Sequence, residues 1–466
     1  MKKELSKSIS VGVAINILAF VLVKSMNIIT APVMTKILAT EDYGIYSIFN
    51  TWSGIIGIVA GLGVLGSLTN FRVKANRDDY LKYCCNMLWI GIIGHLILFV
   101  ISFLARGCIA RLLKLPEVLI PIMVISAMSS YCVTFLSTFL VIDNMALYNA
   151  GISFFAVAGS FGLSLALIRI CNVTTDLYFP FIEGHLIIYL VISLGCVTFF
   201  AVKGKSRIRL DYAQYGLLIG VPLIFHSLAG SVLGSSDRIM LQQIDGLSVA
   251  GVYSFTYGFA GILSSIWQAI NSIWTPFLFK YLKDGDEKSL YEKKRNFDFL
   301  YTMMTIGFIL VYPEVFKLLA NERYWGQIKI VPIIVIAFYA NHLYSFPTNY
   351  ETYKEKTKYV AIGSIGAAIV NIILNSILIP SMHEIGASVA TAISYFALFV
   401  FHYFISKRII GDYPLRNVIR VEYITSFGAS IVALYVFFDL WWIRWVLAIV
   451  VGATLLKDVI KRKAIL

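Results

Sequence analysis

Residues 15–29, INILAFVLVKSMNII, decide the class of protein to which this chain belongs. They lie inside an apolar run that we expect to form one helix over residues 9–38, and about 20 apolar residues suffice to cross a bilayer. Similar runs recur along the whole chain of 466 residues. Only 14% of the residues are charged, compared with about 25% in soluble domains, and 59% are hydrophobic. The sequence therefore indicates a multi-pass membrane protein rather than a soluble enzyme.

The apolar runs predict an all-α polytopic fold with about fourteen transmembrane helices joined by short connections. Lys and Arg outnumber Asp and Glu by 39 to 26. With both termini cytoplasmic, most of these cations fall in cytoplasmic loops, as the positive-inside rule requires. Because no basic block lies outside a loop, we expect no nucleic-acid partner. The expected helices are residues 9–38, 43–69, 82–105, 117–141, 149–171, 179–202, 213–237, 249–279, 297–319, 330–349, 359–380, 385–405, 423–440 and 443–460.

A short motif occurs twice in equivalent places. YGIYS at residues 43–47 opens the second expected helix, and AGVYS at residues 250–254 opens the eighth, each after a polar residue able to cap a helix, Asp42 and Ser248. Chance recurrence in a chain rich in Gly and Tyr is the alternative. We predict two pseudo-symmetric six-helix bundles with a transport path at their interface, followed by two additional transmembrane helices. The corresponding ranges are residues 1–210, 211–408 and 409–466.

Charged side chains at mid-membrane depth are the strongest functional signal, because one at a helix centre costs about 2.5–3.5 kcal/mol. Lys24 lies near the middle of the first expected helix, and Asp237 and Arg238 end the seventh. The two copies of the motif are 207 residues apart, so Arg238 corresponds to position 31 of the first half. That position lies two helical turns from Lys24, on the same face of an equivalent helix. We predict that both cations face a cavity for an anionic substrate. The alternatives are a structural ion pair for Lys24 and an Asp-Arg pair that marks the helix end.

Amide and hydroxyl side chains gather on the eleventh and twelfth expected helices. Asn371 and Asn375 are four residues apart and face the same way, and the next helix carries Ser388 and Thr391. Hydrogen bonding between two helices explains such residues. The alternative is a cation site made of side-chain oxygens, in which Asp237 takes part.

Aromatic and amide residues cluster on the eighth and tenth expected helices. Sugar rings are often met by aromatic faces and amides, although Trp and Tyr also form belts at membrane interfaces. The candidates for a substrate cavity are Trp267, Gln268, Asn271, Tyr339 and Asn341. A proton relay is a further hypothesis for isolated polar residues within helices, namely His95, Glu183, His185, His226 and Glu314.

Two apparent signatures of cofactor sites are better explained in other ways. Residues 61–66, GLGVLG, match the dinucleotide-binding pattern, but no strand precedes them, so we attribute these glycines to helix packing. The six cysteines form no C-x-x-C pair and have no histidine at metal-ligand spacing. We therefore expect no cofactor, no bound metal and no catalytic residues, and the chain is not predicted to be an enzyme.

Several motifs, in this order, resemble the polysaccharide transporter family, the O-antigen and capsule repeat-unit flippases of the multidrug/oligosaccharidyl-lipid/polysaccharide exporter superfamily. They are TEDYGIYS at residues 40–47, SSDRIML at 235–241, GVYS at 251–254, WTP at 274–276, the Asn371 and Asn375 pair, and GASVAT at 386–391.

The resemblance implies a flippase that moves an undecaprenyl-pyrophosphate-linked oligosaccharide across the bacterial cytoplasmic (inner) membrane, from the cytoplasmic to the outer leaflet, by alternating access. It implies coupling to a Na+ or H+ gradient, and polysaccharide polymerase and chain-length proteins as partners besides membrane lipids. Lys24 and Arg238 would bind the pyrophosphate. Related lipid II flippases have a sodium site where this chain has Asp237, Asn371, Asn375 and Thr391, and Asn375 replaces an acidic residue of that site.

Three other functions remain as alternatives. A drug/cation antiporter of the same superfamily needs acidic residues in its cavity, whereas Lys24 and Arg238 are cations. A membrane glycosyltransferase or polymerase normally has large external loops, and the longest loop here, around residues 280–296, is predicted to be cytoplasmic. A scaffold that only binds lipid-linked intermediates is the third.

Overall fold

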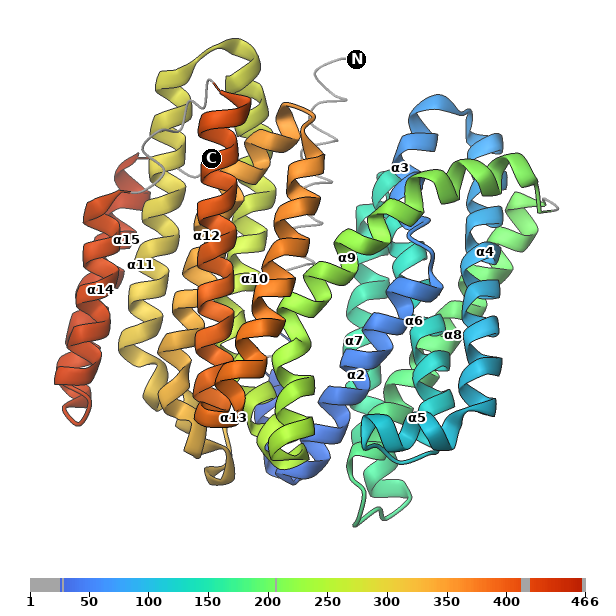
Figure 1. Cartoon of the computed structure of the whole chain (residues 1–466), viewed down its shortest axis with the longest axis horizontal. Helices are drawn as coiled ribbons and strands as arrows, with labels where there is room; N and C mark the ends of the chain where they lie inside the picture. Colours follow the sequence, from blue (N-terminus) through green and yellow to red (C-terminus); the bar gives the residue numbers. More distant parts are fainter. Residues whose placement is uncertain (1–25, 27–28, 206–207, 412–419, 463–466) are drawn as a thin grey trace. The chain divides into compact units, whose positions relative to one another are not determined.

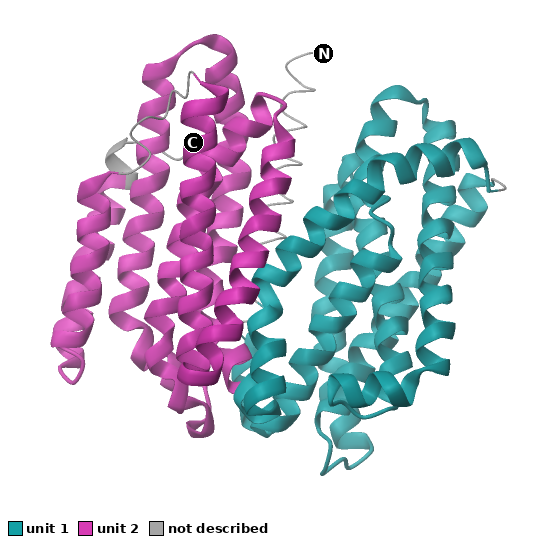
Figure 2. Ribbon diagram, in the orientation of Figure 1, with its two compact units in different colours: residues 1–251 teal, residues 252–466 magenta. Residues whose placement is uncertain are grey.

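The computed structural model describes residues 26, 29–205, 208–411 and 420–462, and these residues form helices and connections without a strand (Figure 1). They include nine helices long and apolar enough to cross a membrane, or ten if one bent pair counts as a single span. The prediction of an all-α membrane protein is confirmed, and the count of fourteen helices stays a prediction. The chain divides into two compact units, residues 1–251 and 252–466 (Figure 2).

Most helices of the first unit lie close to the expected spans. An apolar segment in lipid forms a helix because a helix satisfies its own backbone hydrogen bonds. It adds a short helix after α4, where we expected only a loop. The helix α9, expected to open the second bundle, also belongs to this unit, and the division of the chain by its repeat stays a prediction. The helices are α2 (Thr40–Ala60), α3 (Leu65–Lys74), α4 (Arg77–Leu104), α5 (Arg106–Leu113), α6 (Leu119–Ile142), α7 (Ala146–Ile170), α8 (Tyr178–Gly204) and α9 (Leu210–Asp245).

One expected helix, residues 43–69, is broken. The chain bends by 42° between α2 and α3, where Leu62 and Gly63 have φ angles of 51° and 64°. The break packs against Gly220 of α9 so closely that a Cβ on Gly63 would overlap the carbonyl oxygen of Gly220. The attribution of these glycines to packing is confirmed, but a continuous helix was wrong, because the left-handed backbone at Leu62 and Gly63 ends α2.

The two copies of the repeated motif contact each other. A Cβ on Gly44 would overlap the carbonyl oxygen of Leu247, and a Cβ on Gly251 would overlap that of Thr40. Leu247 follows Thr40 by the same 207 residues by which Gly251 follows Gly44, so the contact is symmetric. The hydroxyls of Thr40 and Ser248 lie 2.6 Å apart.

The two polar residues expected to cap these helices, Asp42 and Ser248, lie inside the helices rather than before them. Ala39 precedes α2 and makes no side-chain cap, so Asp42 lies in the first turn of that helix. The helix α10 begins at Leu247, which puts Ser248 in its first turn as well.

The second unit contains the remaining helices. Two expected helices, 359–380 and 385–405, run together as α13 with one non-helical residue between them, His383, at φ 49° and ψ −130°. The elements are α10 (Leu247–Asp284), which begins in the first unit, α11 (Glu287–Leu319), η1 (Glu322–Ile330), α12 (Val331–Tyr353), α13 (Thr357–Phe404), η2 (Ile405–Ile410), α14 (Val421–Val436) and α15 (Trp441–Arg462).

A buried arginine joins α15 to α11. Arg444 lies in the first turn of α15 with 1% of its side chain exposed. Its guanidinium donates to both carboxylate oxygens of Glu314, at 2.5 and 3.1 Å, and to the carbonyls of Leu310, Phe437 and Phe438. Glu314 is therefore paired rather than isolated.

Candidate functional site

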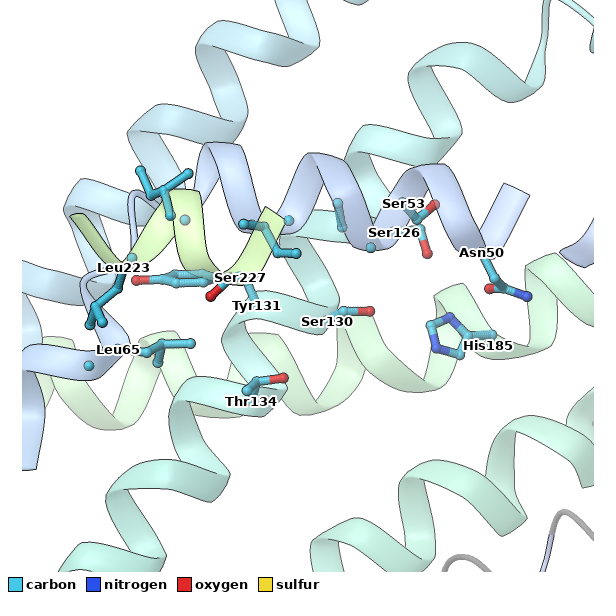
Figure 3. Close-up of a pocket in the computed structure, with 18 residues that line it drawn as sticks. Asn50, Ser53, Leu65, Ser126, Ser130, Tyr131, Thr134, His185, Leu223 and Ser227 are labelled. Carbon is cyan, nitrogen blue, oxygen red and sulfur yellow. The ribbon is translucent and has the colours of Figure 1, made fainter. Parts of the chain in front are cut away.

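A cavity of about 500 Å³ lies within the first unit, between α2, α3, α6, α8 and α9 (Figure 3). Ligand pockets typically measure roughly 300–1,000 Å³, so the cavity is large enough to hold part of a substrate. Among the described residues that line it, none is Asp, Glu, Lys or Arg. Its polar side chains are Asn50, Ser53, Ser126, Ser130, Tyr131, Thr134, His185 and Ser227.

The lining residues form stripes on two helices. On α2 and at its C-cap, Asn50, Gly54, Gly57 and Gly61 are spaced three or four residues apart and share one face, beside which lies Ser53. On α6 the polar positions recur every fourth residue, as Ser126, Ser130 and Thr134. The small side chains leave the space open, and a Cβ on Gly54 would meet no atom within 4 Å.

Tyr131 of α6 forms a fixed part of the wall. Its hydroxyl donates a hydrogen bond of 2.8 Å to the carbonyl of Met87 on α4, and 5% of the residue is exposed. Gly91 makes room for this ring, because a Cβ at that position would overlap it. His95, one of the isolated polar residues, is buried beside Tyr131 with its ring centroid 5.3 Å away.

His185 of α8 lines this cavity and also a second one of about 180 Å³. Its ring stacks on Tyr189, with centroids 3.9 Å apart. The second cavity is lined by further hydroxyl side chains, including Tyr46, Ser160 and Ser164. A neutral imidazole has one donor and one acceptor nitrogen, so His185 can hydrogen-bond polar groups in either cavity.

Of the two predicted cavity cations, the structure describes only Arg238. Lys24 lies outside the described residues. Arg238 is half-buried on α9, and its backbone N–H donates to the carboxylate of buried Asp237 at 2.8 Å. The helix continues to Asp245, so the prediction that these two residues end it was wrong. Neither residue lines the cavity of Figure 3, and a cavity with two cations stays a prediction.

The predicted substrate residues of the second unit occupy different surroundings. Trp267 and Tyr339 are buried: the Trp267 indole donates to Ser345 at 3.2 Å, and the Tyr339 hydroxyl lies 3.0 Å from that of Thr302. Asn271 is half-buried and accepts a hydrogen bond of 2.8 Å from the Asn349 side chain. Gln268 is exposed and Asn341 half-buried. Their roles in substrate binding stay predictions.

Three of the four ion-coupling candidates lie together in α13. Asn375 donates to the side chain of Asn371 at 3.0 Å, and Asn371 donates to Thr391 at 3.5 Å. All three are fully buried. The network joins the two halves of α13 across the break at His383, which is the interhelical hydrogen bonding given as one explanation of these residues. Asp237 belongs to the first unit, and a cation site stays a prediction.

Sequence reasoning missed every residue of the larger cavity except His185, because it searched for charged and aromatic side chains. The sequence indicates these cavity residues by a different pattern. Glycines and hydroxyls at helical spacing interrupt otherwise apolar helices, as Ser126, Ser130 and Thr134 do in α6. Among the described residues, no group of three His, Cys, Asp or Glu is placed to hold a metal ion.

Comparisons with known proteins identify the family. The family model described as "Polysaccharide biosynthesis protein" matches residues 9–282, more than half of the chain. The capsular polysaccharide biosynthesis protein CapF of Staphylococcus aureus is 26% identical over 245 residues, which are 48% of this chain. The match spans only 60% of the length of CapF.

Two solved structures share the fold. The lipid II flippase MurJ in an inward closed conformation has a TM-score of 0.67 at 14% identity, with 96% of this chain and 99% of MurJ covered. An inward-facing multidrug resistance transporter of the MATE family has a TM-score of 0.61 at 14% identity, with 84% and 99% covered. The chain is therefore a multi-pass membrane protein that belongs to the polysaccharide biosynthesis protein family.

Proposed function

We propose that the chain is a flippase that moves an undecaprenyl-pyrophosphate-linked oligosaccharide, an O-antigen or capsule repeat unit, from the cytoplasmic to the outer leaflet of the bacterial cytoplasmic membrane. The observation that carries the proposal is the cavity of about 500 Å³ with hydroxyl, amide and imidazole side chains but no charged side chain among its described lining residues. Such a lining suits a neutral, polyhydroxylated group. Family membership and the likeness of the fold to a lipid II flippase support the same conclusion.

The three parts of the substrate need different surroundings. Sugar hydroxyls both donate and accept hydrogen bonds, which Asn50, Ser130 and His185 can match. The pyrophosphate needs positive charge, for which Lys24 and Arg238 remain the candidates. The prenyl chain stays in the lipid. Alternating access, driven by a Na+ or H+ gradient, would then carry the glycan across, and a polymerase would use it on the far side.

Transport across liposome membranes tests the proposal. The purified chain is reconstituted with a fluorescent undecaprenyl-pyrophosphate oligosaccharide, and the fraction that reaches the other leaflet is measured over time. Gly54→Leu places a side chain in the open cavity, where its Cβ meets no atom within 4 Å, and should abolish crossing. Gly195→Leu is the matched control, because a Cβ on that exposed glycine of α8 also meets no atom within 4 Å but lies outside the cavity.

The outcomes separate the candidate functions. Crossing that requires the protein, fails in Gly54→Leu and persists in Gly195→Leu supports the flippase. Equal crossing in both variants would show that the cavity does not carry the glycan. Export of ethidium without any crossing of the lipid-linked oligosaccharide would instead favour a drug/cation antiporter.

A further inference from the structure

A charged cluster is buried in the second unit, outside the cavity. Lys294 and Asp298 lie one turn apart on α11 and form an ion pair, and Nε2 of His342 on α12 lies 3.2 Å from the other Asp298 oxygen. The side chains of Lys294 and His342 are 1% exposed, and that of Asp298 is 4% exposed. His342 lies near the middle of α12, inside a stretch long and apolar enough to cross a membrane, residues 322–353.

The chemistry of the cluster leaves one place for a proton. Lys294 and His342 each face one oxygen of Asp298, and Lys294 balances the charge of the carboxylate. Nε2 of His342 approaches Oδ1 of Asp298 without the geometry of a hydrogen bond, and in the neutral tautomer with its hydrogen on Nε2 the acceptor is Nδ1. Nδ1 is buried and has no hydrogen-bond partner among the described residues. A carboxylate behind the ring stabilises the imidazolium that forms when Nδ1 takes a proton.

Among the described residues, the rings that contact His342 supply no second acid. On α10 the Trp267 ring meets the His342 ring edge to face, with centroids 4.1 Å apart, and Tyr301 of α11 lies at 4.6 Å. Tyr339 of α12 lies at 5.6 Å. Tyr339 and Tyr423 both interact electrostatically with Asp298, and Tyr423 interacts in turn with Arg420 and Arg295.

We propose that His342, held by Asp298 and Lys294, is the proton-binding site through which the chain couples transport to a proton gradient. The proposal rests on the transport function proposed above. A proton on His342 changes the cluster from neutral to singly positive, and an excess charge is unfavourable in a dry interior. The protonated cluster therefore favours a different packing of α10, α11 and α12. Trp267 passes this change to α10, where Gln268 and Asn271 are substrate candidates.

A spectroscopic experiment tests the proton site without any transport. An imidazolium quenches a neighbouring indole, so the tryptophan emission of the full chain in lipid nanodiscs should fall in a step as the medium is acidified. His342→Gln should lose the step because the acceptor is gone, and Trp267→Phe should lose it because the reporter is gone. His402→Gln is the matched control: His402 is also fully buried against a carboxylate, with Nδ1 2.9 Å from Glu351, and it should keep the step.

Every outcome of the emission experiment either supports or overturns proton binding at His342. No step in the wild type, a step that survives in His342→Gln or Trp267→Phe, or loss of the step in His402→Gln alone would overturn the proposal. Should His342→Gln fail to fold, Trp267→Phe still tests whether the step comes from this cluster.

Transport supplies the second measurement. Crossing of the lipid-linked oligosaccharide in liposomes should be faster with a pH gradient than without one, and this dependence should vanish in His342→Gln but not in His402→Gln. A dependence that persists in His342→Gln would refute coupling at this residue. Absence of crossing in the wild type would refute the flippase function, while the emission step would still decide whether His342 binds a proton.

Discussion

Replacing Arg444 with methionine should separate the last two helices from the rest of the second unit. The guanidinium makes five hydrogen bonds, two to Glu314 and three to backbone carbonyls of α11 and of the turn before α15. Methionine fills a similar length but donates nothing. The substitution therefore leaves the Glu314 carboxylate and three carbonyls without these donors, and the contact of α15 with α11 loses its polar component.

The size of the effect follows from these contacts. Hydrogen bonds within membrane proteins average about 0.6 kcal/mol, so five of them amount to about 3 kcal/mol. Removing one partner of a buried ion pair costs about 3–5 kcal/mol. Because the Glu314 side chain is 33% exposed and can regain water, we expect the lower end of that range. For a unit of this size, a loss of about 3 kcal/mol lowers the melting temperature by roughly 6–12 °C.

Thermal unfolding in detergent, followed by size-exclusion chromatography of the soluble fraction, measures this shift. Glu314→Leu combined with Arg444→Met removes the carboxylate left without its partner, and should recover part of the lost stability. An Arg444→Met variant that melts within about 2 °C of the wild type would refute the reasoning, since that shift corresponds to less than about 1 kcal/mol. So would a double variant whose loss equals the sum of the two single losses.

Two further predictions concern close packing and the amide network. Gly251→Val should prevent folding, because the new Cβ would overlap the carbonyl oxygen of Thr40, whereas Gly258→Val in the same helix meets no atom within 4 Å and should be purified in normal yield. Asn375→Leu should lower the melting temperature because it removes the hydrogen bond to Asn371, which is worth about 1 kcal/mol. Replacing choline chloride with sodium chloride should not stabilise the wild type, since the Asn371 side-chain oxygen already accepts from Asn375; stabilisation that Asn375→Leu abolishes would establish a sodium site.

Much of the fold was predictable because lipid imposes simple rules. Apolar length defines a spanning helix, so the boundaries of α6 and α8 lie within a few residues of the expected ones. The break at Leu62 and Gly63 was not predictable in the same way, because these residues are apolar or small and the hydropathy of the segment does not change. Its cause is a tertiary contact with Gly220, about 160 residues later in the chain.

The site was harder to predict than the fold. A charge count draws attention to cations such as Arg238, but it cannot distinguish a charge that faces a cavity from one that is paired within the protein, as Arg444 and Lys294 are. Pairing depends on which helices are neighbours. The lining of the cavity consists of serine, threonine and glycine, which are equally common at helix contacts in membranes, so only three-dimensional packing shows that Ser130 and Gly54 border open space.

The symmetric contact of Gly44 and Gly251 bears on the origin of the chain. Two separate half-length chains related by a two-fold axis would make this same contact, with each glycine against the backbone of the other copy. The protein product of a gene that encoded one half could thus have formed a dimer before gene duplication and fusion joined the halves. Under the predicted repeat, a larger side chain at either glycine collides with the backbone of the other copy of the motif, so the contact restrains both positions from diverging.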